Sequence, residues 1–193
     1  MPCTKLAVPR VKQFDDRWCG PACAQMVLLS LGLISDTTKV QQAALWNEIV
    51  ANNPGFPKTE TCGAQPPLEW ATYPDALAQT LNTHIGQPTT HVIPETNEDL
   101  VLGHALASVQ RLVPAIVLVE DETHWIVVFG CDNSARRPQH TVGPTNDPVT
   151  HVLVRDPANS GYPTRITLDT WIVAIYAVGC GVYAGSYVVV GAS

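Results

Sequence analysis

The chain has 193 residues, of which 46% are hydrophobic and 15% charged, and its formal net charge is −6 at pH 7. This composition is typical of a folded globular domain, and an acidic balance without any basic run argues against nucleic acid or an anionic membrane as the main partner. No stretch reaches the roughly 18 apolar residues of a membrane span, and residues 1–10 lack the apolar core of a secretory signal. We therefore expect a protein that is cytoplasmic or exported without a classical signal peptide, for example as a secreted effector.

The first strong pattern, at residues 13–33, is a polar approach that ends in Trp-Cys-Gly-Pro and leads into an apolar helix. Further apolar neighbours leave this helix little polar surface, so it should lie buried at the centre of the domain. Gly20 and Pro21 fit the helix start, because proline presets φ and lacks an N–H that the first turn does not use. Cys19 would then lie at the positive end of the helix dipole, which favours a reactive thiolate. The alternative is a buried structural thiol. Apolar residues recur along the helix at helical spacings, at Ala22, Met26, Leu29 and Leu33.

The elements that follow are predicted in chain order from hydrophobic periodicity and turn signals. The helix at about 39–52 opens with a capping-box pattern at Thr38 and Gln41. The strands at 115–119 and 124–129 flank an acidic turn and predict a hairpin at the heart of a sheet. The other predicted helices are at 76–81, at 97–111 and, with a strand as the alternative, at Leu168–Ile175; the other strands are at 91–93, 151–154 and 187–190.

Helices first and strands afterwards indicate an α+β domain. We expect a single domain, residues 1–193, with a helical half at about 13–112 and a sheet half at about 113–193. Loops at 53–74 and 132–149 are rich in turn-forming residues, and we expect them to line or cover a cleft.

Six cysteines are dispersed along the sequence, and no Cys-x-x-Cys pair occurs. Setting aside a reactive Cys19 leaves an odd number, which weakens a disulfide framework. Cys19 and Cys23 are four residues apart on one helix, a spacing that suits neither a relaxed disulfide nor a structural zinc site. We therefore expect most of the cysteines to be reduced core thiols, and we expect no metal or other cofactor. They are Cys3, Cys19, Cys23, Cys62, Cys131 and Cys180.

Gln13 stands six residues ahead of Cys19, and this combination resembles the active-site opening of papain-like cysteine peptidases. The Cys-Gly-Pro-Ala run is most similar to bacterial peptidases related to the bacteriocin-leader (double-glycine) processing family. The resemblance implies a papain-like fold, in which a central helix packs on a C-terminal antiparallel sheet. It also implies that Cys19 is the nucleophile and that the Gln13 side chain donates to the oxyanion hole. Leader-processing enzymes are usually fused to transporter domains, which this sequence lacks, so a double-glycine leader is not the expected substrate.

The other two expected members of the site are His124 and Asp156. His124 begins the most apolar strand, where it leaves an acidic turn, and could alternatively cap a strand edge. Asp156 follows a strand and precedes a proline, a pair that also commonly starts turns; Asn159 is the closest amide substitute. The resemblance favours both as members of the site. Next to a thiolate, a histidine can protonate the leaving amine, and a carboxylate can orient that histidine.

The sequence therefore predicts a cysteine peptidase that hydrolyses a peptide or protein substrate. Two other functions remain open. One is acyl transfer, because transglutaminase-like enzymes use the same Cys, His, Asp order. The other is a peptide-docking module that has lost catalysis.

Overall fold

The computed structural model describes residues 3–53, 72–119, 124–132, 149–158, 165–168, 170–171 and 186–193. The helices formed by these residues are α1 (Cys19–Ser30), α2 (Lys39–Asn52), α3 (Pro74–Ile85) and α4 (Glu98–Gln110). The strands are β1 (Thr90–Glu95), β2 (Ala115–Val119), β3 (His124–Asp132), β4 (His151–Arg155), β5 (Arg165–Thr167) and β6 (Tyr187–Ala192). Within this part of the chain, no helix is long and apolar enough to cross a membrane.

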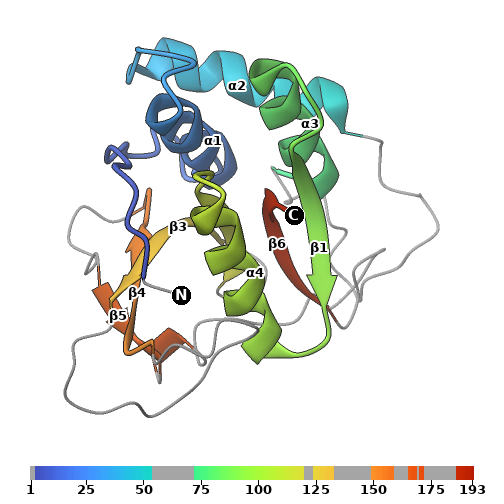
Figure 1. The fold of residues 1–193 in the computed structure, drawn as a ribbon. Helices are drawn as coiled ribbons and strands as arrows, with labels where there is room; N and C mark the ends of the chain where they lie inside the picture. The colour runs from blue at the N-terminus through green and yellow to red at the C-terminus, as the bar shows by residue number, and fades with distance from the viewer. Residues whose placement is uncertain are drawn as a thin grey trace.

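The described strands form one antiparallel sheet with the order β1-β6-β2-β3-β4-β5 (Figure 1). β2 and β3 pair along the whole of β2, which confirms the antiparallel pair predicted at the heart of the sheet. β4 runs antiparallel to β3 with Val127 opposite Arg155. The end of β4 therefore lies beside the beginning of β3, and this corner of the sheet carries two of the expected site residues.

Helices cover both faces of the sheet. On one face, Ile116 and Leu118 of β2 pack in a core cluster with residues of α1, α2 and α3. On the other face, Val117 and Val119 pack in a second cluster with α4. Successive strand residues point to opposite faces, so burial on both faces explains why β2 is an apolar run without alternation. Figure 1 shows α4 lying across the sheet, apart from α2 and α3.

The central helix predicted from the first pattern is α1, and its burial is confirmed, because every residue from Cys19 to Leu28 is buried. The helix ends where Gly32 adopts a left-handed φ of +71°, a conformation that glycine tolerates without a Cβ clash. The N–H of Leu33 then donates to Leu28 O at 3.0 Å, which closes the helix end. Leu33 therefore lies outside the helix with 43% of its surface exposed, although the sequence pattern placed it on the buried stripe.

The helices predicted at about 39–52, 76–81 and 97–111 are confirmed as α2, α3 and α4. Thr38 caps α2 by accepting a hydrogen bond from the backbone N–H of Gln41 at 3.5 Å, which is one half of the predicted capping box. The N–H of Thr38 donates to Asp36 Oδ1 at 2.7 Å rather than to the Gln41 side chain. The strands predicted at 91–93, 151–154 and 187–190 correspond to β1, β4 and β6. β5 was not predicted, because it spans three residues of which only the middle one is buried.

Some predicted segments lie outside the described residues. The loops at 53–74 and 132–149 do so except at their ends. Only Leu168, Thr170 and Trp171 of the helix predicted at 168–175 are described, and these three residues are helical.

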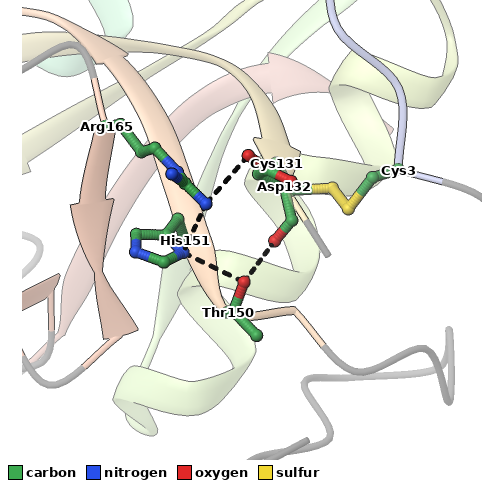
Figure 2. Close-up of a disulfide and its surroundings, with 6 residues drawn as sticks. All are labelled: Cys3, Cys131, Asp132, Thr150, His151 and Arg165. Carbon is green, nitrogen blue, oxygen red and sulfur yellow. Dashed lines mark hydrogen bonds and ion pairs between the residues drawn. A yellow bond between two sulfur atoms is a disulfide. The ribbon is translucent and has the colours of Figure 1, made fainter. Parts of the chain in front are cut away.

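Cys3 and Cys131 are not among the reduced thiols expected for most cysteines, because they form a disulfide with a Cα–Cα distance of 5.3 Å (Figure 2). The N-terminal segment runs along the end of β3, where Leu6 N donates to Phe129 O at 2.9 Å. A Cβ on Gly130 would come within 2.7 Å of the backbone O of Thr4, so only glycine permits this close approach. Cys19 and Cys23 are free and buried, as expected; Cys62 and Cys180 lie outside the described residues.

Candidate active site

Three of the four expected site residues lie at the ends of elements that meet beside the sheet. Cys19 is the first residue of α1 and is 7% exposed. His124 is the first residue of β3, and Asp156 directly follows β4. Because β3 and β4 are antiparallel, the beginning of one and the end of the other share a corner of the sheet. Backbone pairing therefore positions His124 next to Asp156.

His124 and Asp156 form a buried hydrogen-bonded pair. The Nε2 atom of His124 lies 2.7 Å from Oδ1 of Asp156, and the two side chains are 10% and 5% exposed. The same Oδ1 accepts a hydrogen bond from the backbone N–H of Ala158 at 2.8 Å, which fixes the carboxylate. The other described histidine–carboxylate pairs, His84–Glu48 and His104–Glu95, are at least 21% exposed in each side chain. Burial therefore sets the His124 pair apart from them.

The protonation of His124 is decided by opposing effects. Burial lowers its pKa, because desolvation disfavours the charged imidazolium. The hydrogen bonds to Asp156 and to Cys19, together with the negative charges of these two partners, outweigh burial and raise the pKa to about 10. His124 is therefore an imidazolium near neutral pH, hydrogen bonded to the Asp156 carboxylate.

Gln13 lies close to the same corner. Its backbone N–H donates to Pro157 O at 2.9 Å, one residue beyond Asp156. Its side-chain Nε2 donates to Asp16 O at 3.1 Å, and its Oε1 is buried without a hydrogen-bond partner among the described residues. An amide nitrogen carries two donors, so the bond to Asp16 leaves one hydrogen for another acceptor.

The side chains around Cys19 are tightly packed. A Cβ on Gly20 would overlap the Thr72 side chain, so the position after Cys19 has no room for a larger residue. The Trp125 Nε1–H donates to Thr72 O at 3.3 Å. The Cys23 thiol donates to Trp125 O at 3.2 Å, and complete burial raises the pKa of this thiol well above its usual range. Cys23 is therefore a protonated packing residue.

Sequence reasoning missed several residues that surround the site. Trp46 of α2 stacks on Trp18 with ring centroids 6.2 Å apart, beside the position that precedes Cys19. Gln25 and Gln42 are fully buried and bonded to each other. The sequence signal that could have indicated this pair is a glutamine on an otherwise apolar helix face. Polar residues are seldom buried without partners, so such a glutamine predicts a buried hydrogen bond. Among the described residues, no group of three or more His, Cys, Asp or Glu side chains could hold a metal ion.

Comparison with solved structures gives two similar peptidase domains. One is a double-glycine motif protease from an AMS/PCAT transporter, solved in complex with the leader peptide, with a TM-score of 0.53, 12% identity and coverage of 98% of this chain and 95% of that one. The other is the peptidase domain of Streptococcus ComA, a bi-functional ABC transporter, with a TM-score of 0.49, 18% identity and coverage of 98% and 99%. The first likeness confirms the predicted papain-like α+β fold.

Comparison with curated proteins gives no match. Comparison with protein families gives a match over most of the chain, and the matched residues include all four expected site residues. Residues 5–177 match the Peptidase_C39 like family, to which this chain therefore belongs.

Proposed function

We propose that this protein is a cysteine peptidase that hydrolyses peptide bonds with Cys19 as its nucleophile, His124 as its acid and base, and Asp156 as the group that orients His124. The observation that carries the proposal is the buried hydrogen-bonded pair of His124 and Asp156, and Cys19 supports it as the other group that raises the pKa of His124. Family membership and fold independently support a peptidase.

In the first half of the reaction, the Cys19 thiolate attacks the carbonyl carbon of the scissile bond and forms a tetrahedral intermediate. The free amide hydrogen of Gln13 and the backbone N–H of Cys19 stabilise its oxyanion. The N–H of Cys19 suits this role, since the first N–H groups of a helix have no partner within the helix. His124 then gives its proton to the departing amine, the C–N bond breaks, and a thioester to Cys19 remains.

In the second half, His124 takes a proton from water while the water oxygen attacks the thioester carbonyl. Collapse of the second tetrahedral intermediate breaks the C–S bond, releases the carboxylic acid product and regenerates the thiolate–imidazolium pair. Asp156 stays ionised throughout and holds the imidazole in the tautomer and orientation that both steps need.

The proposed substrate is a peptide or an extended protein segment. The AMS/PCAT transporter protease was solved with a leader peptide bound, and we extend only the chemical class of that ligand to this chain.

The test is cleavage of a proteome-derived peptide library, read by mass spectrometry. We expect defined cleavages with the wild-type protein, none with Cys19→Ala, and retained cleavage with Cys23→Ser, which removes the other free thiol of the described chain. An added amine such as hydroxylamine distinguishes acyl transfer from hydrolysis by the mass of the product. Cleavage by Cys19→Ala at the wild-type rate would refute the proposal, and a Cys19 that does not react with iodoacetamide at about pH 6 would favour the docking module.

A further inference from the structure

Two glutamines form a polar connection inside the apolar layer of helices. Gln25 of α1 and Gln42 of α2 are both fully buried. Gln42 Nε2 donates to Gln25 Oε1 at 3.0 Å. Gln25 Nε2 in turn donates to Asp36 O at 2.8 Å and to Thr38 O at 3.3 Å, in the segment that connects the two helices. A buried amide costs free energy unless its donors and acceptor are paired, and here each is.

Gln42 also bonds the backbone on both sides of Gln13. Its Nε2 donates to Lys12 O at 3.2 Å, and its Oε1 accepts from Phe14 N at 2.8 Å. The side-chain amide thus pairs with the chain as a neighbouring strand would. From the opposite direction, Pro157 O accepts the backbone N–H of Gln13 itself at 2.9 Å. The backbone at residues 12–14 is therefore fixed by α2 and by the segment that carries Asp156.

Only one orientation of the Gln42 amide is compatible with these contacts. Lys12 O and Gln25 Oε1 can only accept hydrogen bonds, and Phe14 N can only donate. Exchanging Nε2 and Oε1 would oppose acceptor to acceptor at two contacts and donor to donor at the third. The amide therefore specifies one position of the loop relative to α1.

The Gln13 side chain has little support of its own. Its Nε2 makes one bond, to Asp16 O within the same loop, and no described residue bonds its buried Oε1. Its position relative to Cys19 must therefore come from the backbone that carries it. That backbone is connected to α1, the helix that begins at Cys19, through Gln42 and Gln25.

We propose that Gln42, supported by Gln25, is a positioning residue that fixes the Gln13 amide at the oxyanion site of Cys19. This inference rests on the proposed function, which assigns Gln13 as the oxyanion donor. Gln42 itself does not touch substrate, so its effect on the reaction passes through Gln13.

The variant that tests this is Gln42→Met, which keeps the length and volume of the side chain and removes all three hydrogen bonds. We expect the rate of Cys19 acylation by the ester p-nitrophenyl acetate to fall about 10- to 100-fold, because a displaced donor loses much of the benefit of preorganisation. Alkylation of Cys19 by iodoacetamide forms no oxyanion in its transition state, so its rate should stay at the wild-type value. If Gln42→Met does not fold, Gln42→Asn, which retains the amide one methylene short, replaces it in the same two assays.

The matched control is Asn82→Leu. Asn82 also binds a loop backbone through its side-chain amide, accepting from Thr89 N and Thr90 N and donating to Thr90 O, in the α3–β1 connection. Asn82→Leu removes four side-chain hydrogen bonds and Gln42→Met removes three, so both should lower the melting temperature. Only Gln42→Met should lower the ratio of acylation to alkylation.

A double-mutant cycle with Gln13→Ala completes the test. If Gln42 acts through Gln13, adding Gln42→Met to Gln13→Ala changes acylation by less than about threefold. Additive effects, or equal losses in acylation and alkylation, would overturn the inference. The ester assay does not depend on peptide cleavage, so a wild-type protein that acylates but cleaves no peptide would refute the proposed peptidase function and leave the positioning role supported.

Discussion

Replacing Asp156 separates the two ways in which this carboxylate acts on His124. Its Oδ1 accepts both the bond from His124 Nε2 and the bond from Ala158 N. An asparagine at position 156 presents a carbonyl oxygen at the same place, so Asp156→Asn keeps both bonds and removes the charge. Asp156→Ala removes the charge and both bonds. The comparison of these two variants with the wild type therefore measures charge and hydrogen bonding separately.

The magnitude follows from the pKa of His124. A rise from the usual 6.5 to about 10 corresponds to a preference for the imidazolium on the order of 5 kcal/mol, shared between Asp156 and Cys19. The hydrogen bond to Asp156 is the largest of the raising effects. We therefore expect the pKa of His124 to fall markedly in Asp156→Ala, and to take an intermediate value in Asp156→Asn, where the hydrogen bond remains.

The assay is the pH profile of kcat/KM, whose limbs report ionisations of the free enzyme. The alkaline limb should lie near pH 10 in the wild type, where His124 loses its proton, and should move to lower pH in the order Asp156→Asn, then Asp156→Ala.

The pH dependence of the free energy of unfolding gives a second measurement. A raised folded-state pKa contributes stability that is complete below about pH 6.5 and lost as the pH rises through about 10. The destabilisation by Asp156→Ala should therefore be larger at pH 6 than above about pH 10. An alkaline limb that stays in place in Asp156→Ala would refute the assignment of Asp156 as the partner of His124.

Three further predictions concern the surroundings of the site. Gly20→Ala should destabilise the fold by about 1–3 kcal/mol in urea denaturation, because the new methyl group overlaps the Thr72 side chain; an unchanged midpoint would contradict this packing. Iodoacetamide at about pH 6 should label Cys19 and spare Cys23, whose pKa burial raises, and peptide mapping that finds Cys23 labelled first would contradict this distinction. Cys131→Ser should cost about 2–4 kcal/mol by opening the disulfide, and a reductant should lower the melting temperature of the wild type but not of this variant; equal shifts in both would contradict the pairing.

The elements that the sequence predicted are those whose signals are local. The buried helix α1, the capped start of α2 and the antiparallel pair of β2 and β3 each follow from patterns within about twenty residues. The positions of His124 and Asp156 at strand ends follow from the same patterns, since each apolar run stops beside them. Their mutual contact did not follow from local patterns, because it depends on the register between β3 and β4.

The contacts that the sequence did not predict join segments that are far apart in the chain. Cys3 and Cys131 are 128 residues apart and meet because the N-terminal segment pairs with the end of β3. Nothing in the composition around either cysteine indicates this pairing. A count of cysteines was therefore a poor guide, because the odd number left after Cys19 said nothing about which of the others are neighbours.

Gln13 shows the limit of a motif most clearly. The spacing of six residues to Cys19 identifies the residue, but a spacing does not specify where an amide points. In the folded chain the Gln13 amide donates to Asp16 O, and Gln42, 28 residues after Phe14 in the sequence, bonds the backbone on both sides of Gln13. Oxyanion stabilisation requires donors held within tenths of an ångström of their productive positions. A sequence with the Gln–Cys spacing but an apolar residue in place of Gln42 would therefore keep the motif and lose the support that we propose for the Gln13 amide.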